Sequence, residues 1–282
     1  MSEGRTALSV GNRRLLLTVA AIALVWMALP SLSMRAAPLP NTIAIEDMTW
    51  TEVRDARENG YTTVIVPTGG LEQNGPHMAI GKHNFIVREA ADRIAKAVGR
   101  TLVAPVVAYV PQGTYDPPTG HLRFPGTMGV PETVFDGMLD GIARSLKAGG
   151  FKTICFIGDH GGSQPVQKAV AERLSAEWAK DGVRVLHIDG YYDDRQQIAR
   201  LLKEGRSLET IGQHASLIDT SELMSINPKG VDLARYRELI NSIRPSGVSG
   251  DPSGANADLG TSLFDMRVAA AVSQIKALQA QR

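Results

Sequence analysis

Short apolar runs rich in β-branched residues alternate with amphipathic segments along most of the chain. The pattern predicts strands at residues 62–67, 101–107, 153–157 and 183–188, and helices at residues 50–59, 85–98, 134–148, 166–180 and 257–278. This alternation predicts an α/β fold with three α/β/α layers and a mostly parallel central sheet. Ligands of such sheets bind outside the carboxyl ends of the strands.

Polar residues gather at those strand ends. Glu72 follows the first strand, and Asp159 and His160 follow the third, inside the glycine-rich text GDHGG. Of the six histidines only His187 lies within a strand pattern, while the other five lie in text broken by glycine and proline: His77, His83, His121, His160 and His214. A divalent metal binds imidazoles and carboxylates that converge from separate segments. From the residues alone, a metal-binding loop and a polar turn both remain open for the stretch around Glu72.

Five motifs occur in order across residues 45–280. They are EQNGPH at 72–77, FPGT at 124–127, GDHGG at 158–162, HA with DTS at 214–221, and GDP at 250–252. Together they resemble the creatininase family of metal-dependent amidohydrolases. The resemblance implies a three-layer α/β/α domain over residues 45–282, divalent zinc or manganese ions, and assembly into homo-oligomers, either trimers or hexamers.

The resemblance also implies roles for particular residues. Glu72 and His160 match ligands of one metal ion, His214 matches a catalytic histidine, and Asp219 matches a glutamate that handles protons or contacts metal. Two positions depart from the family, because Asn74 replaces a histidine and His83 replaces the aspartate that bridges two ions. A neutral imidazole offers one lone pair and cannot bridge.

The altered ligands predict one ion in preference to two. Zinc is the expected cofactor and manganese the second choice, held by Glu72, His83 and His160. The alternative is a second ion held weakly by Asp219. Five more residues are expected to bind substrate or orient the ligands: Asn74, His77, His121, Arg123 and Asp159.

In this interpretation the chain hydrolyses a cyclic or small amide with a metal-activated water, and Asp219 or His214 transfers the proton. Two other functions remain open from the sequence. The same water attack would open a lactone or another ester ring, and a catalytically silent protein would bind a small molecule without hydrolysing it.

The first 37 residues differ from the rest of the chain. Arg13 and Arg14 precede an uncharged apolar run at 15–30, which predicts either a signal peptide cleaved near 33–37 or an uncleaved inner-membrane anchor. The paired arginines loosely match a twin-arginine signal. We therefore expect an exported protein, periplasmic or secreted, whose only membrane contact is this segment when it is not cleaved.

Composition limits the remaining classes of function. The 30 basic and 29 acidic residues nearly cancel, so there is no basic field to bind nucleic acid. The single cysteine, Cys155, lies in an apolar run and cannot form an intramolecular disulfide. We expect it to be a buried core residue, and a small molecule to be the substrate.

Overall fold

The computed structural model describes residues 42–242 and 245–281, which belong to one unit, Leu39–Arg282. The predicted signal peptide or anchor lies outside these residues. Within the described ranges, no helix combines the length and the hydrophobicity that crossing a membrane requires.

Four parallel strands form the central sheet, in the order β2-β1-β3-β4. Their bounds are β1 Thr63–Thr68, β2 Thr101–Val103, β3 Thr153–Gly158 and β4 Arg184–His187. The two central strands, β1 and β3, are in register from Thr63 opposite Thr153 to Thr68 opposite Gly158, and every residue in both is buried. Such fully buried strands are typical of a parallel sheet covered on both faces.

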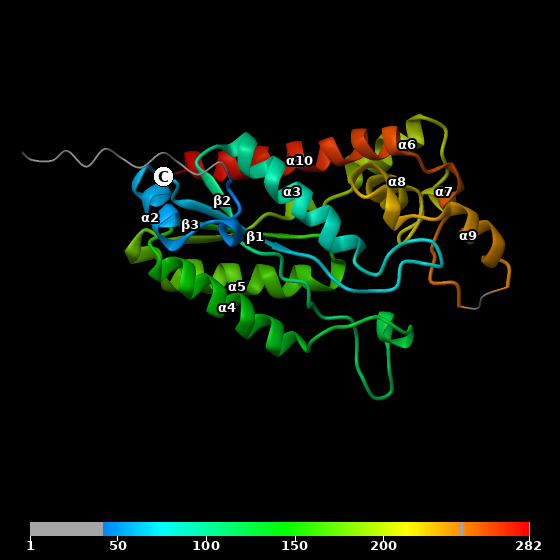
Figure 1. The fold of residues 1–282 in the computed structure, drawn as a ribbon, viewed down its shortest axis with the longest axis horizontal. Helices are drawn as coiled ribbons and strands as arrows, with labels where there is room; N and C mark the ends of the chain where they lie inside the picture. Colours follow the sequence, from blue (N-terminus) through cyan, green and yellow to red (C-terminus); the bar gives the residue numbers. More distant parts are fainter. Residues whose placement is uncertain (1–41, 243–244, 282) are drawn as a thin grey trace, which may run out of the picture. The chain divides into compact units, whose positions relative to one another are not determined.

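Helices cover both faces of this sheet. Their bounds are α2 Trp50–Glu58, α3 Lys82–Val98, α4 Glu132–Ala148, α5 Gln164–Glu177, α6 Arg195–Lys203, α7 Leu208–Ile211, α8 Leu217–Ile226, α9 Leu233–Leu239 and α10 Ala257–Ala280. Figure 1 shows α3 and α10 on one side of the sheet and α4 and α5 on the other. The three-layer fold predicted from the sequence is therefore confirmed.

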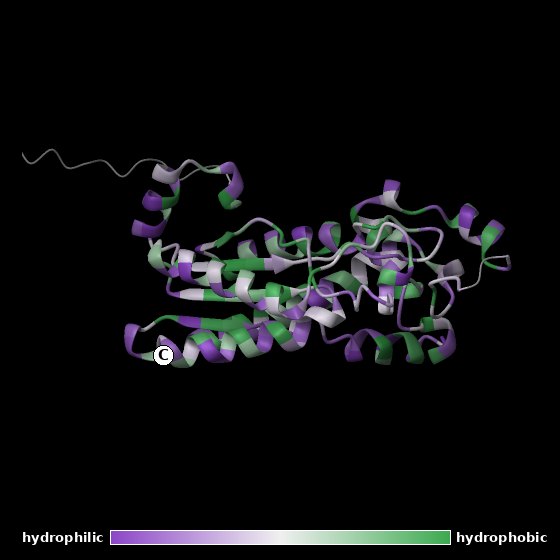
Figure 2. Cartoon of the chain, turned by 90° about the horizontal axis from the view of Figure 1, so that it is seen from below, coloured by the Kyte–Doolittle hydropathy of each residue, from purple (hydrophilic) through white to green (hydrophobic). Residues whose placement is uncertain are grey.

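Alternate side chains of each central strand enter two separate cores. Ile65 and Cys155 pack with α3 and α10, whereas Val64 and Phe156 pack with α4 and α5. Figure 2 shows the apolar strands between helices whose polar residues are interspersed with apolar ones. Because successive side chains point to opposite faces and both faces are buried, apolar residues occupy successive positions and the strands read as continuous apolar runs.

The chain leaves β1 and β3 toward opposite faces of the sheet. The segment after β1 leads into α3, and the segment after β3 leads into α5. Adjacent parallel strands whose connections diverge in this way leave a crevice at their carboxyl ends, where α/β proteins bind ligands. Glu72 follows one of these strands and His160 the other.

Several elements differ from the sequence prediction, and α6 and α9 are among those that were not predicted. Strand β2 ends at Val103, although Val107 N still donates a hydrogen bond of 2.9 Å to Pro67 O of β1. Helix α3 begins at Lys82, so His83 lies in its first turn and not in a loop. Helix α8 was not predicted, since it buries residues on several sides and lacks an amphipathic period.

Candidate metal centre

The carboxylate of Glu72 is surrounded by four imidazoles. Its Oε1 lies 2.6 Å from Nε2 of His83 and 3.7 Å from Nδ1 of His214. Its Oε2 lies 2.8 Å from Nε2 of His160 and 3.4 Å from Nε2 of His121. Glu72 itself is 1% exposed, so a single buried carboxylate is the centre of the cluster.

Each of these side chains comes from a different element. Glu72 lies in the loop after β1, whose backbone is closed by a hydrogen bond from Glu72 N to Ile80 O of 3.1 Å. His83 is in the first turn of α3, and His160 follows β3. His121 is in a short 3-10 helix, Gly120–Arg123, and His214 precedes α8. The fold therefore assembles this site from segments far apart in the sequence.

Behind the cluster, His83 is held by a buried ion network. Its Nδ1 lies 2.7 Å from Oδ2 of Asp159, whose Oδ1 accepts hydrogen bonds from Arg267 and Tyr191. Arg267 also donates to Glu222 at 2.7 Å. When Nδ1 of His83 donates its proton to Asp159, Nε2 faces Glu72, which is how a carboxylate orients a metal-ligating histidine.

The charge state of Glu72 follows from its neighbours. Burial alone would raise its pKa, but the charge of His83 and the contacts with His160 and His83 outweigh burial and hold the pKa far below its usual range. The carboxylate is thus ionised at neutral pH. Its Oε2 is buried and makes no well-aligned hydrogen bond to any described residue, despite the contact with His160.

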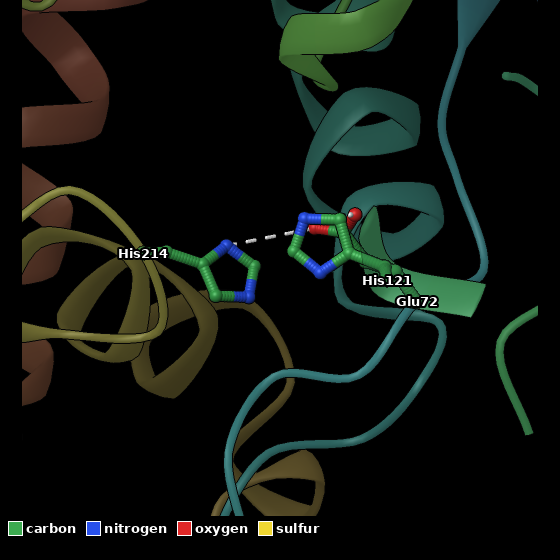
Figure 3. Close-up of side chains that lie close together, drawn as sticks. All are labelled: Glu72, His121 and His214. Atoms are coloured by element: carbon green, nitrogen blue, oxygen red, sulfur yellow. Dashed lines mark ion pairs between the residues drawn. The ribbon is translucent and has the colours of Figure 1, made fainter. Parts of the chain in front are cut away.

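The donors that meet at Glu72 fit a divalent cation. One ligand atom each from Glu72, His121 and His214 lie within 4.8 Å of one another. Figure 3 shows these three side chains close together. Burial lowers the pKa of His121, and burial together with Lys82 lowers that of His214 to about 4. Both imidazoles are therefore neutral at pH 7, and each has one ring nitrogen with a lone pair.

Gln73 orients these two histidines. Its Nε2 lies 3.1 Å from Nδ1 of His121 and 3.0 Å from Nε2 of His214. Nε2 of His214 also lies 2.9 Å from the carbonyl oxygen of Gln73. When this ring nitrogen donates to the carbonyl, it cannot also accept from the amide of Gln73, and Nδ1 of His214 keeps its lone pair toward Glu72.

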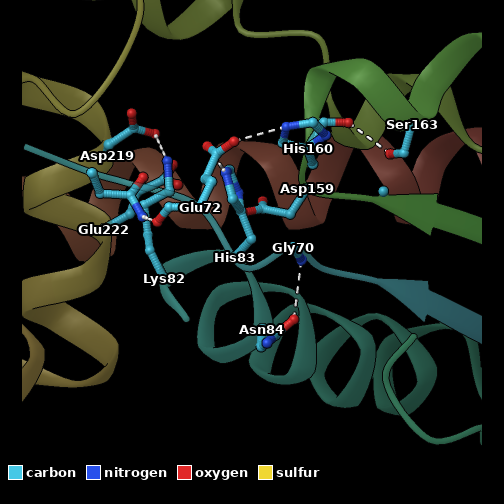
Figure 4. Close-up of polar contacts among 12 residues, drawn as sticks. Gly70, Glu72, Lys82, His83, Asn84, Asp159, His160, Ser163, Asp219 and Glu222 are labelled. Atoms are coloured by element: carbon cyan, nitrogen blue, oxygen red, sulfur yellow. Dashed lines mark hydrogen bonds and ion pairs between the residues drawn. The ribbon is translucent and has the colours of Figure 1, made fainter. Parts of the chain in front are cut away.

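A buried ammonium group lies next to the cluster. Lys82 is 1% exposed, and its Nζ lies 3.2 Å from Oδ1 of Asp219 (Figure 4). Oδ2 of Asp219 accepts a hydrogen bond of 2.7 Å from the backbone N–H of Ala215. Burial alone would raise the pKa of Asp219, but Lys82 and the other neighbours lower it, so this carboxylate is ionised.

The cluster opens into a cavity of about 880 Å³. Eight of the residues selected from the sequence line it: Glu72, His83, His121, Arg123, Asp159, His160, His214 and Asp219. Asn74 and His77 do not. The Nδ2 of Asn74 donates to the carbonyl oxygens of Glu72 and Ala79, and Nε2 of His77 lies 3.0 Å from Oγ1 of Thr220.

The geometric metal set differs in part from the predicted set. Glu72 belongs to both sets. In the structure its ligand atoms converge with those of His121 and His214. The sequence had predicted His83, His160 and Asp219 as the other ligands. His83 and His160 nevertheless contact the same carboxylate. Asp219 is paired with Lys82 instead.

Several residues of the site were missed at the sequence level. Lys82 carries no signal of its own, because a lysine in a first helical turn is usually exposed. Gln73 lies beside Glu72 in the first motif, and its position there was the only available indication. Arg267 lies in a predicted helix and Glu222 in the unpredicted α8, and the two meet only in three dimensions.

A carboxylate and imidazole centre at the switch point of a parallel sheet is typical of α/β hydrolytic enzymes that use a divalent cation. The family model described as creatininase, creatinine amidohydrolase, matches residues 46–275. The chain therefore belongs to the creatininase family.

Characterised relatives have different substrates. The mycofactocin precursor peptide peptidase of Mycolicibacterium smegmatis is 27% identical over 247 residues, 78% of this chain and 86% of the relative. The creatinine amidohydrolase of Pseudomonas putida is 25% identical over 202 residues, 70% and 76% of the two chains. The 3-dehydro-scyllo-inosose hydrolase of Thermotoga maritima is 24% identical over 191 residues, 67% of this chain but only 58% of the relative.

Solved structures support the fold. A manganese form of creatininase superposes with a TM-score of 0.67 at 22% identity, covering 83% of this chain and 98% of that one. A mutant creatininase described as of Zn-Zn type gives the same TM-score and identity, covering 84% and 98%.

Proposed function

We propose that this chain is a metal-dependent amidohydrolase that opens a cyclic amide or cleaves a small amide. The observation that carries the proposal is the single buried Glu72 carboxylate, with four imidazoles around it, at the base of an open cavity. A polar turn needed only for folding would have no use for so many donors at one point. Family membership adds independent support for hydrolysis.

Glu72, His121 and His214 would hold the cation, with His83 and His160 as the adjacent ligands predicted from the sequence. When bound, such an ion polarises a carbonyl group and lowers the pKa of water. Zinc suits this mixture of imidazole and carboxylate, and manganese is the second candidate. We propose one ion per chain, because the described residues contain a single group of converging ligand atoms.

Asp219 is the group we assign to proton transfer. Lys82 and the N–H of Ala215 keep its carboxylate ionised, so it can accept a proton from the attacking water and return it to the leaving nitrogen. His214 was the alternative from the sequence, but its place in the metal group leaves Asp219 as the better candidate. Arg123 lines the cavity and is available to hold a substrate oxygen.

A substrate panel tests the proposal. Purified protein would be assayed with lactams, primary amides and lactones, before and after chelation and after addition of zinc. We expect hydrolysis of amides that chelation abolishes and zinc restores. Faster hydrolysis of lactones would favour the ester-ring alternative, and no hydrolysis with ligand binding unchanged in His160→Ala would favour a silent binding protein.

Substitution of the proton acceptor gives a sharper test. Asp219→Asn should lower kcat by about 10²- to 10⁴-fold, because it removes the general base. Asp194→Asn is the matched control, since Asp194 lines the same cavity without contacting Lys82. Equal activities of the two variants would contradict the assignment of Asp219.

The family resemblance also supports a homo-oligomer, and the sequence of residues 1–37 supports export. Gel filtration with light scattering would test the first, with a trimer or hexamer expected. N-terminal sequencing of the protein recovered from a periplasmic fraction would test the second.

A further inference from the structure

The hydroxyl group of Tyr192 lies in the cavity wall without a hydrogen-bond partner. Tyr192 comes after β4 and a short 3-10 helix, Asp189–Tyr191, and it lines the same cavity as Glu72 and His160. Its backbone N–H donates to Asp189 O, but its hydroxyl group makes no hydrogen bond to another residue within 42–242 and 245–281. The side chain is 40% exposed, so a ligand in the cavity can contact it.

This hydroxyl group lies against the backbone next to His160. A Cβ on Gly161 would lie 2.6 Å from Oη and 3.5 Å from Cζ of Tyr192, so the hydroxyl group occupies the space that a side chain at position 161 would need. Gly161 is itself exposed and lines the cavity. The neighbouring His160 places Nε2 2.8 Å from Oε2 of Glu72, a contact drawn in Figure 4. The phenol is therefore beside the candidate metal centre.

The surroundings of the phenol keep it protonated. Burial, together with the negative charges of Asp219 and Asp159, raises the pKa of Tyr192 to about 12, and the charge of Arg267 opposes this shift only in part. At neutral pH the hydroxyl group therefore has a proton to donate. Asp219, the carboxylate assigned to proton transfer, lines the same cavity.

The carbonyl oxygen of the substrate is the atom that suits such a donor. Attack of water on an amide moves negative charge onto this oxygen. A hydrogen-bond donor fixed beside it stabilises the transition state more than the bound substrate. The leaving nitrogen needs a whole proton, which Asp219 supplies in the proposed mechanism.

We propose that the hydroxyl group of Tyr192 donates a hydrogen bond to the carbonyl oxygen of the substrate and stabilises the negative charge that develops there. The proton stays on the phenol, so Tyr192 is a catalytic hydrogen-bond donor and not an acid. This inference rests on the proposed function and adds to it a residue outside the five sequence motifs.

Removal of the hydroxyl group alone tests the proposal. Wild-type protein and Tyr192→Phe, both loaded with zinc, would be compared on the amide that the wild-type protein hydrolyses fastest. We expect kcat to fall by about 10²-fold with little change in KM, because the donor acts mainly in the transition state. Tyr109→Phe is the control and should keep its kcat, since Tyr109 is exposed but does not line the cavity. An unchanged kcat in Tyr192→Phe would overturn the proposal.

A methyl group at position 161 gives a second test that depends on the same contact. Gly161→Ala should displace the hydroxyl group and lower kcat nearly as much as Tyr192→Phe does. In the double variant the methyl group has room, because the nearest ring atom of position 192 would be Cζ at 3.5 Å. We therefore expect the double variant to be no slower than Tyr192→Phe. Losses that multiply would show that Gly161→Ala acts elsewhere and would overturn the proposal.

Binding of a tetrahedral anion separates this proposal from the proposed function. Methylphosphonate, which resembles an attacked carbonyl group, would be titrated by calorimetry into the zinc-loaded wild-type protein and Tyr192→Phe. We expect the variant to bind it about 10- to 100-fold more weakly, because a hydrogen bond to a charged group is lost. If this difference holds while no amide is hydrolysed, the proposed function fails and the role of Tyr192 stands. Equal affinity of the two proteins, or binding by neither, would overturn the role of Tyr192 and leave amide hydrolysis unaffected.

Discussion

Lys82 and Asp219 form an ion pair at the edge of the candidate metal centre, with Nζ 3.2 Å from Oδ1. The lysine is almost fully buried, while the side chain of Asp219 is 28% exposed toward the cavity. A charge buried to this extent persists only with a partner. The pair therefore places a fixed positive charge and an ionised carboxylate next to each other in the wall of the cavity.

The coupling between Lys82 and Asp219 can be measured with a double-mutant cycle. Lys82→Met, Asp219→Asn and the double variant would be compared by urea unfolding. We expect the free energy of unfolding of the double variant to exceed the value predicted by adding the single effects by about 0.5–3 kcal/mol. The reason is that each single change leaves the other group buried without its partner. Lys82→Met with Asp251→Asn is the control pair and should be additive. Additivity in the first pair would contradict the coupling.

Arg267 is expected to be essential for stability. It pairs with Asp159 and with Glu222 at 2.7 Å each, and all three side chains are buried. Arg267→Met should lower the free energy of unfolding by about 3–5 kcal/mol, because two buried carboxylates lose their cation. The surface variant Arg195→Met should change it by less than about 0.5 kcal/mol. A loss for Arg267→Met as small as that for Arg195→Met would be inconsistent with the ion network.

Cys155 should be unreactive in the folded protein. Burial raises the pKa of its thiol to about 12, and the side chain has no exposed surface. Only the thiolate reacts with disulfide reagents such as DTNB, so labelling should require unfolding. We expect one thiol per chain to react in denaturant and almost none in buffer. Rapid labelling of the native protein would show that this strand is accessible.

His77 should make the protein less stable in acid. Its pKa is lowered to about 4, mainly by burial; the charge of Asp219 opposes this shift and the charge of Lys82 adds to it. In an unfolded chain the pKa of histidine is about 6.5. Between these values the unfolded chain binds more protons than the folded one. The stability that neutral His77 contributes is therefore complete above pH 6.5 and is lost as the pH falls toward 4.

The matching measurement compares the wild-type protein with His77→Gln, both free of metal. Urea unfolding at several pH values should show a flatter decline for the variant between pH 6.5 and 4. Above pH 7 the difference between the two proteins should not depend on pH, which serves as an internal control. Parallel curves throughout would rule out His77 as a source of the acid sensitivity.

The sequence predicted the layers of the fold because strands buried on both faces read as apolar runs. It predicted Glu72 and His160 at the site because both follow such strands, where ligands bind. It did not predict α8, because a helix packed between α3 and α10 loses the polar face that marks a surface helix.

The site could be predicted only in part. Nothing in the sequence distinguishes the buried Lys82 from an exposed lysine. His77 lies in the same motif as Glu72, yet the loop turns it toward Thr220 and Tyr236. Loop conformation decides which members of a polar motif face a cavity, and it depends on contacts distant in sequence.

The metal content of the purified protein tests the central claim most directly. Elemental analysis after dialysis should give one zinc or manganese ion per chain for the wild-type protein. Glu72→Gln should lose the ion, because the carboxylate at the centre of the cluster is gone, whereas Glu132→Gln, at a glutamate lining the same cavity, should keep it. Two tightly bound ions would contradict the single-ion centre, and no ion in the wild-type protein would contradict the metal-dependent mechanism altogether.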